Sequence, residues 1–519
     1  RDLAGVRPFY YYSDDSRLVF ASDLPAVAAA AGMSRQLNKM YSSGWAQRSI
    51  LANDETAYAG IFRLPAAHVI VITRDKKRTW AWWTPDQVTE LDLPDENQYA
   101  ERLQQLLYQA VTCRLQAPCQ VGAHLGGGLS SSSVAVIAAR RLRSQGRELV
   151  AIHGLHKTAE EVPGDERQNV ETICSQEGID CHYAQPIDVY DAAFTRIRHS
   201  GDRPPGILLR ERRVRETARQ QGAHVLLTGL GGQGIVSNSG CFDEELLRGN
   251  LLGFWKMLRQ YKQLRKGLTI SFFIRKSMYG RRLRKLRKWV RSGFKAPSKP
   301  KPPIGLLNSP QVWQASFLDR QQPSSRAPQK SLGAGKVVGV RTAQIRKLTG
   351  LVSHLEGWTA SGRQDQIEYR YPLLDRRVIE FALSIPGNLY LHNGFSKWIF
   401  RESLGGILPD SIRWHTGLGK PALQLDRTRI NREFSRDLMQ PLLRQLLTEN
   451  WDWQCLDPQA ARQIVEAAGR AELPDGSWWS APLQALNVEM FFNHQLHESV
   501  SEQLQNRTIG KKVSRARAA

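Results

Sequence analysis

A run of glycines and serines between an apolar stretch and a helix-like stretch carries the clearest chemical signal in the chain. It reads VGAHLGGGLSSSS from Val121 to Ser133, and small apolar residues follow. Where a strand, a glycine turn and a helix start succeed one another, free amide N–H groups and the helix dipole converge on the turn. A flexible Gly/Ser linker is the alternative, but regular patterns flank the run closely on both sides. The segment predicts an anion site formed by Leu125, Gly126, Gly127, Gly128, Ser130, Ser131 and Ser132.

A second glycine cluster follows another apolar strand pattern, in AHVLLTGLGGQGIVSNSG from Ala223 to Gly240. Its candidate ligands are Thr228, Gly229, Gly231 and Gly232, and Gly154 ends a further predicted strand. A plain strand-to-helix turn is the alternative for this cluster. A third segment, IEYRYPLLD from Ile367 to Asp375, contains an acidic residue, a basic residue and a proline at every second position: Glu368, Arg370 and Pro372.

Taken together, the three segments resemble a known family. The first lacks the Lys of a Walker A loop and is similar to the SGG-x-DS loop of enzymes that split ATP between its α and β phosphates. The second is similar to S/T-G-x-G-x-D-E, and the third to E-x-R-x-P-x-L-D. In this order the segments resemble the asparagine synthetase superfamily. Within it, TGLGGQGIVSNSG and the basic insert that follows look most like the lasso-peptide and macrolactam cyclase branch.

The resemblance implies a fold and a domain division. Residues 97–519 would form an ATP-pyrophosphatase domain: an α/β, doubly wound parallel sheet of the pyrophosphatase-loop (adenine nucleotide alpha hydrolase-like) type with a helical C-terminal half. Residues 1–90 resemble part of an α+β glutaminase-like (Ntn) domain, through RDLAGVRPFYYY, LVFASD and IFRLPAAH. Such glutaminases need an N-terminal Cys, whereas this chain starts with Arg1. We therefore expect the nucleophile half to be missing and no glutaminase activity from this chain.

Two departures from the family pattern concern the metal. The family's Asp residues that hold Mg²⁺ on the ATP phosphates correspond to Ser130 and Gln233, and Leu230 replaces a Glu or Tyr. Mg²⁺ prefers carboxylate oxygens, and a hydroxyl is a poor substitute. The resemblance thus implies ATP as the nucleotide, puts Mg²⁺ in question, and predicts impaired or lost turnover.

Two residues are catalytic candidates through the same resemblance. Glu368 is in the third motif, where an acidic residue helps to position the amine or its proton acceptor. An equally weighted alternative is a structural ion pair between Glu368 and Arg370. The family's charge-stabilising Lys falls at Gly417 or Leu418 in LPDSIRWHTGLGKPA, so Lys420 would have to reach the site from a shifted turn.

Hydrophobic spacing predicts the elements that carry these motifs. Helices are expected over 97–115, 131–144, 378–383, 395–404, 431–447 and 458–468, and strands over 18–21, 68–73, 120–125, 148–154 and 182–186. Alternating strands and helices imply a parallel sheet with ligands at the carboxyl ends of its strands. His124 and His153 lack companions at metal-ligand spacing, so we predict packed or backbone-bonded histidines. Asp165 and Glu166 resemble an acidic pair of the family or simply begin a helix.

Charge is concentrated in one part of the 519-residue chain, whose formal net charge is +23. The insert 246–318 contains no Asp or Glu, and Leu283, Leu286, Trp289 and Val290 follow helical spacing among its cations. Such a basic amphipathic helix could bind a peptide or acidic protein, an anionic membrane or nucleic acid, or could be merely solvated. The peptide or protein partner is favoured, and no nucleic-acid module is recognisable.

Composition limits the remaining possibilities. The six cysteines include no C-x-x-C pair, which is typical of a reducing compartment. No apolar run is long enough for a transmembrane segment, and no signal peptide is recognisable. We therefore expect a cytoplasmic protein, whose oligomeric state stays open. A Pro- and Ser-rich stretch at 297–335 is expected to be a linker or an ordered loop, and the basic C-terminus is expected to be disordered.

Three functions follow as hypotheses. The first is an asparagine synthase-like ligase that adenylates a carboxylate and passes the acyl group to an amine, with impaired activity. The second is a pseudoenzyme that binds a nucleotide or peptide. The third is a lasso-peptide-type macrolactam cyclase.

Overall fold

The computed structural model describes most of the chain, with gaps. The described residues are 1–33, 38, 54–73, 75–155, 166–185, 208–236, 249–264, 340–415, 440–449, 451–453, 456–469, 486 and 489. Lys420, the basic helix around Leu283, the linker at 297–335 and the C-terminus therefore lie outside the described residues.

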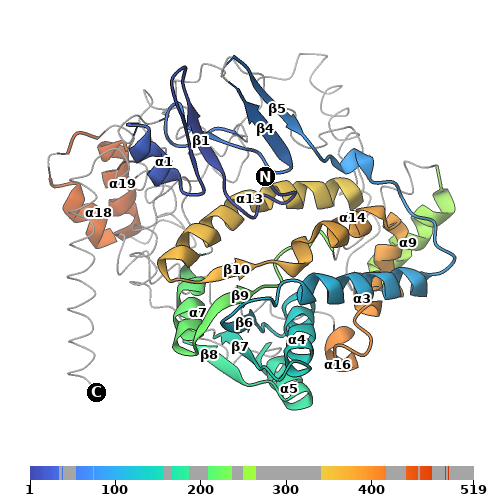
Figure 1. The fold of residues 1–519 in the computed structure, drawn as a ribbon. Coiled ribbons are helices and arrows are strands. Elements are labelled where there is room, and N and C mark those ends of the chain that lie inside the picture. The colour runs from blue at the N-terminus through green and yellow to red at the C-terminus, as the bar shows by residue number, and fades with distance from the viewer. Residues whose placement is uncertain are drawn as a thin grey trace, which may run out of the picture.

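A five-stranded parallel sheet forms the centre of the molecule (Figure 1). Its strand order is β10-β9-β6-β7-β8. The strands are β6 (Gln120–His124), β7 (Leu149–Gly154), β8 (Cys181–Ala184), β9 (Ala223–Leu227) and β10 (Glu368–Arg370). The predictions at 120–125, 148–154 and 182–186 are confirmed with ends shifted by one or two residues. The mixed α/β class with a parallel sheet is confirmed as well.

Helices cover both faces of this sheet (Figure 1). On one face α4 (Leu129–Arg143) contacts α3 (Glu96–Thr112) and α5 (Glu166–Glu177). On the other face α7 (Leu208–Gln220) contacts α13 (Val340–Gln364). The chain runs from β6 outward to β7 and β8, and then returns to place β9 on the other side of β6. The strand order therefore reverses between β6 and β9, which is where open α/β sheets bind ligands.

The helix α3 shows how local sequence sets these elements. Asp95 is its N-cap and accepts hydrogen bonds from the amides of Asn97 and Gln98, at 2.8 and 3.0 Å. Its apolar residues recur every three or four positions and are buried against the core: Tyr99, Leu103, Leu106, Leu107, Ala110 and Val111. The helix predicted over 97–115 is thus confirmed. The one predicted over 131–144 begins two residues earlier than expected, directly after Gly128.

The N-terminal region forms smaller antiparallel sheets. Strand β1 (Tyr10–Ser13) pairs with β2 (Leu18–Ala21) and β3 (Phe62–Arg63), while β4 (His68–Ile72) pairs with β5 (Lys77–Ala81). The strands predicted over 18–21 and 68–73 are confirmed. The helix α1 (Leu24–Ala30) packs on this region, and the short helix η1 (Pro85–Gln87) leads to α3.

Buried charges join this region to the rest of the molecule. Nitrogen atoms of Arg1 and Arg63 each lie 2.8 Å from Oε1 of Glu356 on α13. All three side chains are less than a tenth exposed. Residues such as Leu3, Ala67 and Trp83 also belong to the same hydrophobic core as the sheet. The two regions therefore pack as one body.

The remaining described elements follow β10 in the sequence, except for α9, which lies between β9 and β10. They are α9 (Leu251–Leu264), η3 (Pro372–Leu374), α14 (Arg376–Ser384), η4 (Gly387–Tyr390), β11 (Leu391–His392), β12 (Phe395–Ser396), α15 (Trp398–Glu402), α16 (Asp410–Arg413), α18 (Gln440–Leu446) and α19 (Pro458–Gly469). Within these ranges the C-terminal half is largely helical, as predicted. No helix in the described ranges combines the length and apolarity that crossing a bilayer requires.

The helix predicted over 395–404 is wrong at its start. Phe395 and Ser396 form strand β12, which pairs with β11, and the helix begins only at Trp398. The positive φ angles of Asn393 (48°) and Lys397 (65°) explain the error. They make a tight hairpin and a sharp helix entry that hydrophobic spacing does not reveal.

Candidate functional site

The two glycine turns lie against each other at the point where the strand order reverses. A Cβ atom on Gly229, after β9, would lie 2.5 Å from the amide nitrogen of Ser131 at the start of α4. A Cβ atom on Gly232 would overlap the hydroxyl of Ser130. No side chain larger than hydrogen fits at either position, and the turns after β6 and β9 therefore form one continuous surface.

The first turn leaves the start of α4 without a side-chain cap. Gly127 has a φ of +69°, and a Cβ atom there would lie 2.6 Å from the carbonyl oxygen of Glu166. The side-chain amide (Nδ2) of Asn169 donates to the Gly127 carbonyl oxygen at 3.1 Å and stabilises the turn. Gly128 is the N-cap residue, and a Cβ atom on it would meet nothing within 4 Å. Among the described residues, none therefore covers the positive end of α4 at Gly128.

The third sequence motif closes this arrangement from the other side. Gly231 has a φ of +94°, and a Cβ atom on it would lie 2.9 Å from Cγ of Leu374 in η3. The amide of Thr228 donates to the carbonyl oxygen of Arg370 at 3.1 Å. The hydroxyl of Thr228 accepts a hydrogen bond from the Leu230 amide at 3.2 Å. The structure thus brings together all three segments that the sequence singled out.

The serines of the first turn have different surroundings. Ser131 accepts a hydrogen bond from the Gly126 amide at 3.1 Å and so stabilises the turn itself. Ser132 is fully buried, and its hydroxyl has no hydrogen-bond partner among the described residues. Ser130 is half-buried at the contact between the turns. Leu125 is buried, and Gly154 is exposed at the end of neighbouring β7.

Neither of the two positions that the resemblance assigns to metal ligands carries a carboxylate. Ser130 offers a neutral hydroxyl against Gly232, and Gln233 is exposed. Leu230 packs partly buried against the hydrophobic core. Across the part of the chain that the structure describes, no group of three or more His, Cys, Asp or Glu side chains could hold a metal ion. Mg²⁺ prefers several carboxylate oxygens, so these residues do not fit the ion.

Glu368 forms the ion pair that the sequence offered as an alternative to catalysis. Its carboxylate pairs with Nε of Arg370 at 3.3 Å and also with Arg7 from the N-terminal region. Partial burial acts to raise the pKa of Glu368, but the hydrogen bonds from Arg370 and Arg7 outweigh it, so the pKa is lowered. In the sheet Glu368 pairs with Val225, two residues before β9 ends. Its backbone is therefore set back from the turns.

A buried polar cluster behind the first turn escaped the sequence analysis. Nε2 of His124, the last residue of β6, lies 3.3 Å from Oε2 of Glu211 on α7. The hydroxyl of Tyr369 donates to the same oxygen at 2.9 Å. Burial acts to raise the pKa of Glu211, but His124, Tyr369 and Arg215 together lower it. Glu211 belongs to the charged run RERRVRE, which is typical of a solvated helix face, so no sequence pattern indicates this burial.

The histidine predictions agree with the structure. Nδ1 of His153 lies 2.8 Å from the carbonyl oxygen of Leu125, which is a backbone contact of the expected kind. His124 packs edge-on against Trp358, with ring centroids 5.9 Å apart. Glu166 begins α5, whereas Asp165 lies outside the described residues.

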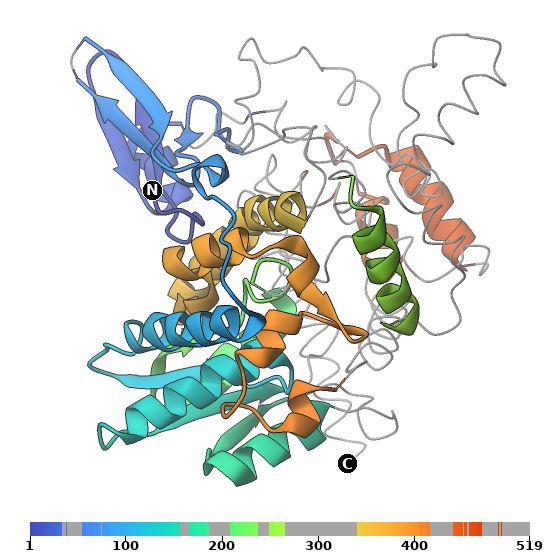
Figure 2. The same cartoon turned by 90° about the vertical axis from the view of Figure 1, so that its right-hand side faces the viewer.

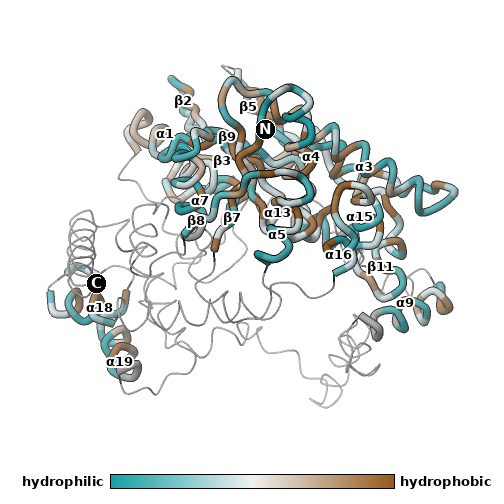
Figure 3. The backbone as a smooth tube through the Cα atoms, turned by 90° about the horizontal axis from the view of Figure 1, so that it is seen from below, coloured by the Kyte–Doolittle hydropathy of each residue, from teal (hydrophilic) through white to brown (hydrophobic). Residues whose placement is uncertain are grey.

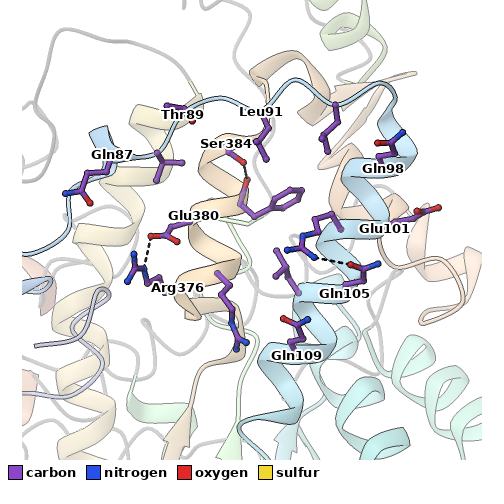
Figure 4. Close-up of a pocket in the computed structure, with 16 residues that line it drawn as sticks. Gln87, Thr89, Leu91, Gln98, Glu101, Gln105, Gln109, Arg376, Glu380 and Ser384 are labelled. Atoms are coloured by element: carbon purple, nitrogen blue, oxygen red, sulfur yellow. Dashed lines mark hydrogen bonds and ion pairs between the residues drawn. The ribbon is translucent and has the colours of Figure 1, made fainter.

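A separate groove lies between α3 and α14. It has a volume of about 1180 Å³, and its lining contains none of the glycine-turn residues. Figure 4 shows polar side chains from both helices around it, with an ion pair between Arg376 and Glu380 and a hydrogen bond between Arg102 and Gln105. Its charged groups are thus largely satisfied within the protein, and the groove is distinct from the converging turns.

Comparisons with known proteins agree with the convergence of the motifs. The model of the asparagine synthase family matches residues 102–493, and that of a glutamine amidotransferase domain matches residues 1–83. Asparagine synthetase (glutamine-hydrolyzing) 3 of Bacillus subtilis is 22% identical over 441 residues, covering 79% of this chain and 62% of its own length. The putative asparagine synthetase (glutamine-hydrolyzing) 2 of Methanocaldococcus jannaschii is 31% identical over 139 residues, 26% of each chain.

Another relative has the name of an amidase. Amidase chry2 of Gibberella zeae is 25% identical over 158 residues, 29% of this chain and 22% of its own. The chain thus spans less than two thirds of the length of each of these relatives. Since the family model covers most of the sequence and its three motifs meet at one edge of the sheet, the chain belongs to the asparagine synthase family, a family that uses ATP.

Proposed function

We propose that this protein is an ATP-dependent, amide-forming ligase of the asparagine synthase type whose turnover is strongly reduced. The observation that carries the proposal is the contact of the second glycine turn with Ser130 and Ser131 at the uncapped start of α4. This contact supports a single nucleotide cradle at the reversal of the strand order. The same contact lacks the carboxylates that the family uses there.

The proposed reaction has two steps. A substrate carboxylate oxygen attacks the α-phosphorus of ATP, and pyrophosphate leaves with the electron pair of the broken P–O bond. An amine then attacks the acyl carbon of the mixed anhydride, AMP leaves and the amine loses a proton, which yields an amide. In this chain the amides at the start of α4 and the glycine turns would hold the phosphate oxygens.

Electrostatics explain the reduced rate. Negative charge builds on the departing pyrophosphate, and preorganised positive groups are usually the largest contribution to catalysis of such a step. The residues at positions 130 and 233 are neutral, so they recruit no divalent cation there. Backbone amides alone would bind phosphate but stabilise the transition state poorly. We therefore assign Glu368 a positioning role through its ion pairs with Arg370 and Arg7. Lys420 stays a candidate for stabilising charge in the acyl-transfer step.

The finer structural assignments belong to the same proposal. Residues 97–519 would be the pyrophosphatase-loop domain of adenine nucleotide alpha hydrolase-like type, and 1–90 a partial glutaminase-like domain. The strand reversal between β6 and β9 and the match of residues 1–83 to a glutamine amidotransferase domain support this division.

A binding protein without turnover is the second candidate. The neutral residues at positions 130 and 233 favour it directly, because they remove metal binding while leaving the turns packed. The macrolactam-forming alternative rests on the resemblance of the TGLGGQGIVSNSG segment and of the basic insert that follows it to that branch.

Exchange of labelled pyrophosphate into ATP tests the proposal. We expect the protein to show exchange far below ordinary ligase rates, and the double variant S130D/Q233D to raise it in a Mg²⁺-dependent way. A control variant, Q145D/Q221D, adds the same two carboxylates at exposed positions away from the turns and should change nothing. Rapid Mg²⁺-dependent exchange by the unaltered protein would contradict the reduced-turnover proposal.

A further inference from the structure

The helix α9 presents an unusual group of apolar side chains to solvent. Leu251, Leu252 and Trp255 are 60%, 85% and 54% exposed. The helix lies at the periphery of the described structure, beside the β11-β12 hairpin (Figures 2 and 3). Exposed Leu and Trp side chains on one helical turn mark an interaction surface more often than a solvated face.

The same helix is firmly anchored on its other side. Phe254 is only 8% exposed, and α9 contacts β11 and β12. At 100° per residue, Leu251, Leu252, Trp255 and Arg259 fall within an arc of about 100°, and Phe254 lies outside this arc, next to Leu251. The exposed apolar group is therefore held outward by a packed helix and is not an unfolded end.

Cations accompany the apolar group. Lys256 and Arg259 are exposed on α9. The insert 246–318 contains eighteen Lys and Arg residues and not one Asp or Glu. A surface that combines Leu and Trp side chains with cations is complementary to the surface of a membrane, where anionic headgroups lie above apolar acyl chains.

We propose that α9 docks on the surface of a bilayer that contains anionic lipids. Leu251, Leu252 and Trp255 enter the boundary between headgroups and acyl chains, and Lys256 and Arg259 contact the lipid phosphates. A nucleic acid would use the cations but would gain little from a neighbouring pair of exposed leucines. An acidic peptide would use the cations in the same way but would leave the side chain of Leu252, which is 85% exposed, without an apolar partner.

Co-sedimentation of the full chain with lipid vesicles tests the proposal. We expect binding to vesicles of phosphatidylcholine mixed with phosphatidylglycerol and much weaker binding to phosphatidylcholine alone. The variant L251S/L252S/W255S should lower the partition coefficient about a hundredfold, because three partly inserted side chains lose their apolar contact. The variant K256Q/R259Q should lower it about thirtyfold at low salt and less at high salt.

A matched control removes exposed apolar surface elsewhere. Leu18 and Phe20 on β2 are 43% and 60% exposed, and L18S/F20S should leave vesicle binding within about twofold of the unaltered protein. Thermal unfolding of each variant checks that the fold is retained. All seven substituted side chains are exposed, so the variants are expected to fold.

Three outcomes would overturn the proposal. The first is failure of the unaltered protein to bind anionic vesicles, and the second is equal loss in the α9 and β2 variants. The third is salt-sensitive capture of a poly-glutamate peptide without any vesicle binding, which would assign the surface to an acidic peptide instead.

Discussion

Two contact regions of this molecule treat charge in opposite ways. Where the N-terminal region meets α13, the carboxylate of Glu356 is buried between Arg1 and Arg63. Burial acts to raise the pKa of Glu356, yet the two arginines outweigh it and the pKa is lowered. Where the two glycine turns meet, the positions expected to carry carboxylates have Ser130 and Gln233.

The two regions show that this fold needs carboxylates for packing at one contact and needs none at the other. Ion pairs that stabilise the packing are present and buried, as for Glu356 and for Asp375 with Arg114 and Arg377. The turn contact is held by the absence of side chains at Gly229 and Gly232, so it survives without any carboxylate. The packing of the turns therefore does not depend on carboxylates at positions 130 and 233.

Removing the buried carboxylate should produce the largest effect. The variant E356Q leaves two arginines buried without a counter-charge, and we expect the free energy of unfolding to fall by about 3 to 5 kcal/mol. Urea denaturation followed by circular dichroism measures the change. The control E216Q breaks half-exposed pairs with Arg212 and Arg213 and should cost less than about 1 kcal/mol. Equal losses of unfolding free energy in the two variants would contradict a structural role for Glu356.

Filling the contact between the turns should have the next largest effect. In G232A the new methyl group overlaps Ser130 and lies 2.8 Å from Cδ1 of Leu373, so we expect a loss of about 1 to 3 kcal/mol. The control G350A adds the same methyl group to α13 in open space and should raise stability by up to about 1 kcal/mol. A stable G232A protein with unchanged nucleotide binding would show that the turns do not need their close contact.

Acid should weaken the second charged contact. Burial acts to raise the pKa of Asp375, but hydrogen bonds from Arg377 and Arg114 lower it to about 2, against an ordinary value of 3.8. Its stabilisation is present above the unfolded pKa near 4 and is lost as the pH falls through about 2. Because the carboxylate is buried but Arg377 is half exposed, we expect a contribution of about 1 to 2 kcal/mol. D375N should remove this part of the pH dependence, and a D375N protein with the unaltered acid profile would argue against it.

Much of this arrangement could be predicted from sequence because it depends on local patterns. The strand and helix on either side of Gly126 to Ser132 have clear hydrophobic periods, and a parallel sheet then brings the strand ends to one edge. The contact between the second glycine turn and Ser130 and Ser131 follows from β6 and β9 being neighbours.

What could not be predicted depends on long-range contacts. The ion pair of Arg7 with Glu368 joins residues 361 positions apart, and no spacing rule identifies such a partner. Glu211 belongs to a run of charges that reads as solvated, yet it is buried beside His124. The start of α15 was misplaced because positive φ angles at Asn393 and Lys397 are backbone choices that hydrophobic periodicity does not encode.

Titration of the full chain with ATP in a calorimeter, with Mg²⁺ and with EDTA, tests the central claim most directly. If the two turns form one phosphate cradle without metal ligands, ATP binds with the same affinity in both conditions, and S130D/Q233D makes binding depend on Mg²⁺. Failure to bind ATP in either condition, or affinity that collapses when EDTA removes the Mg²⁺, would contradict the account.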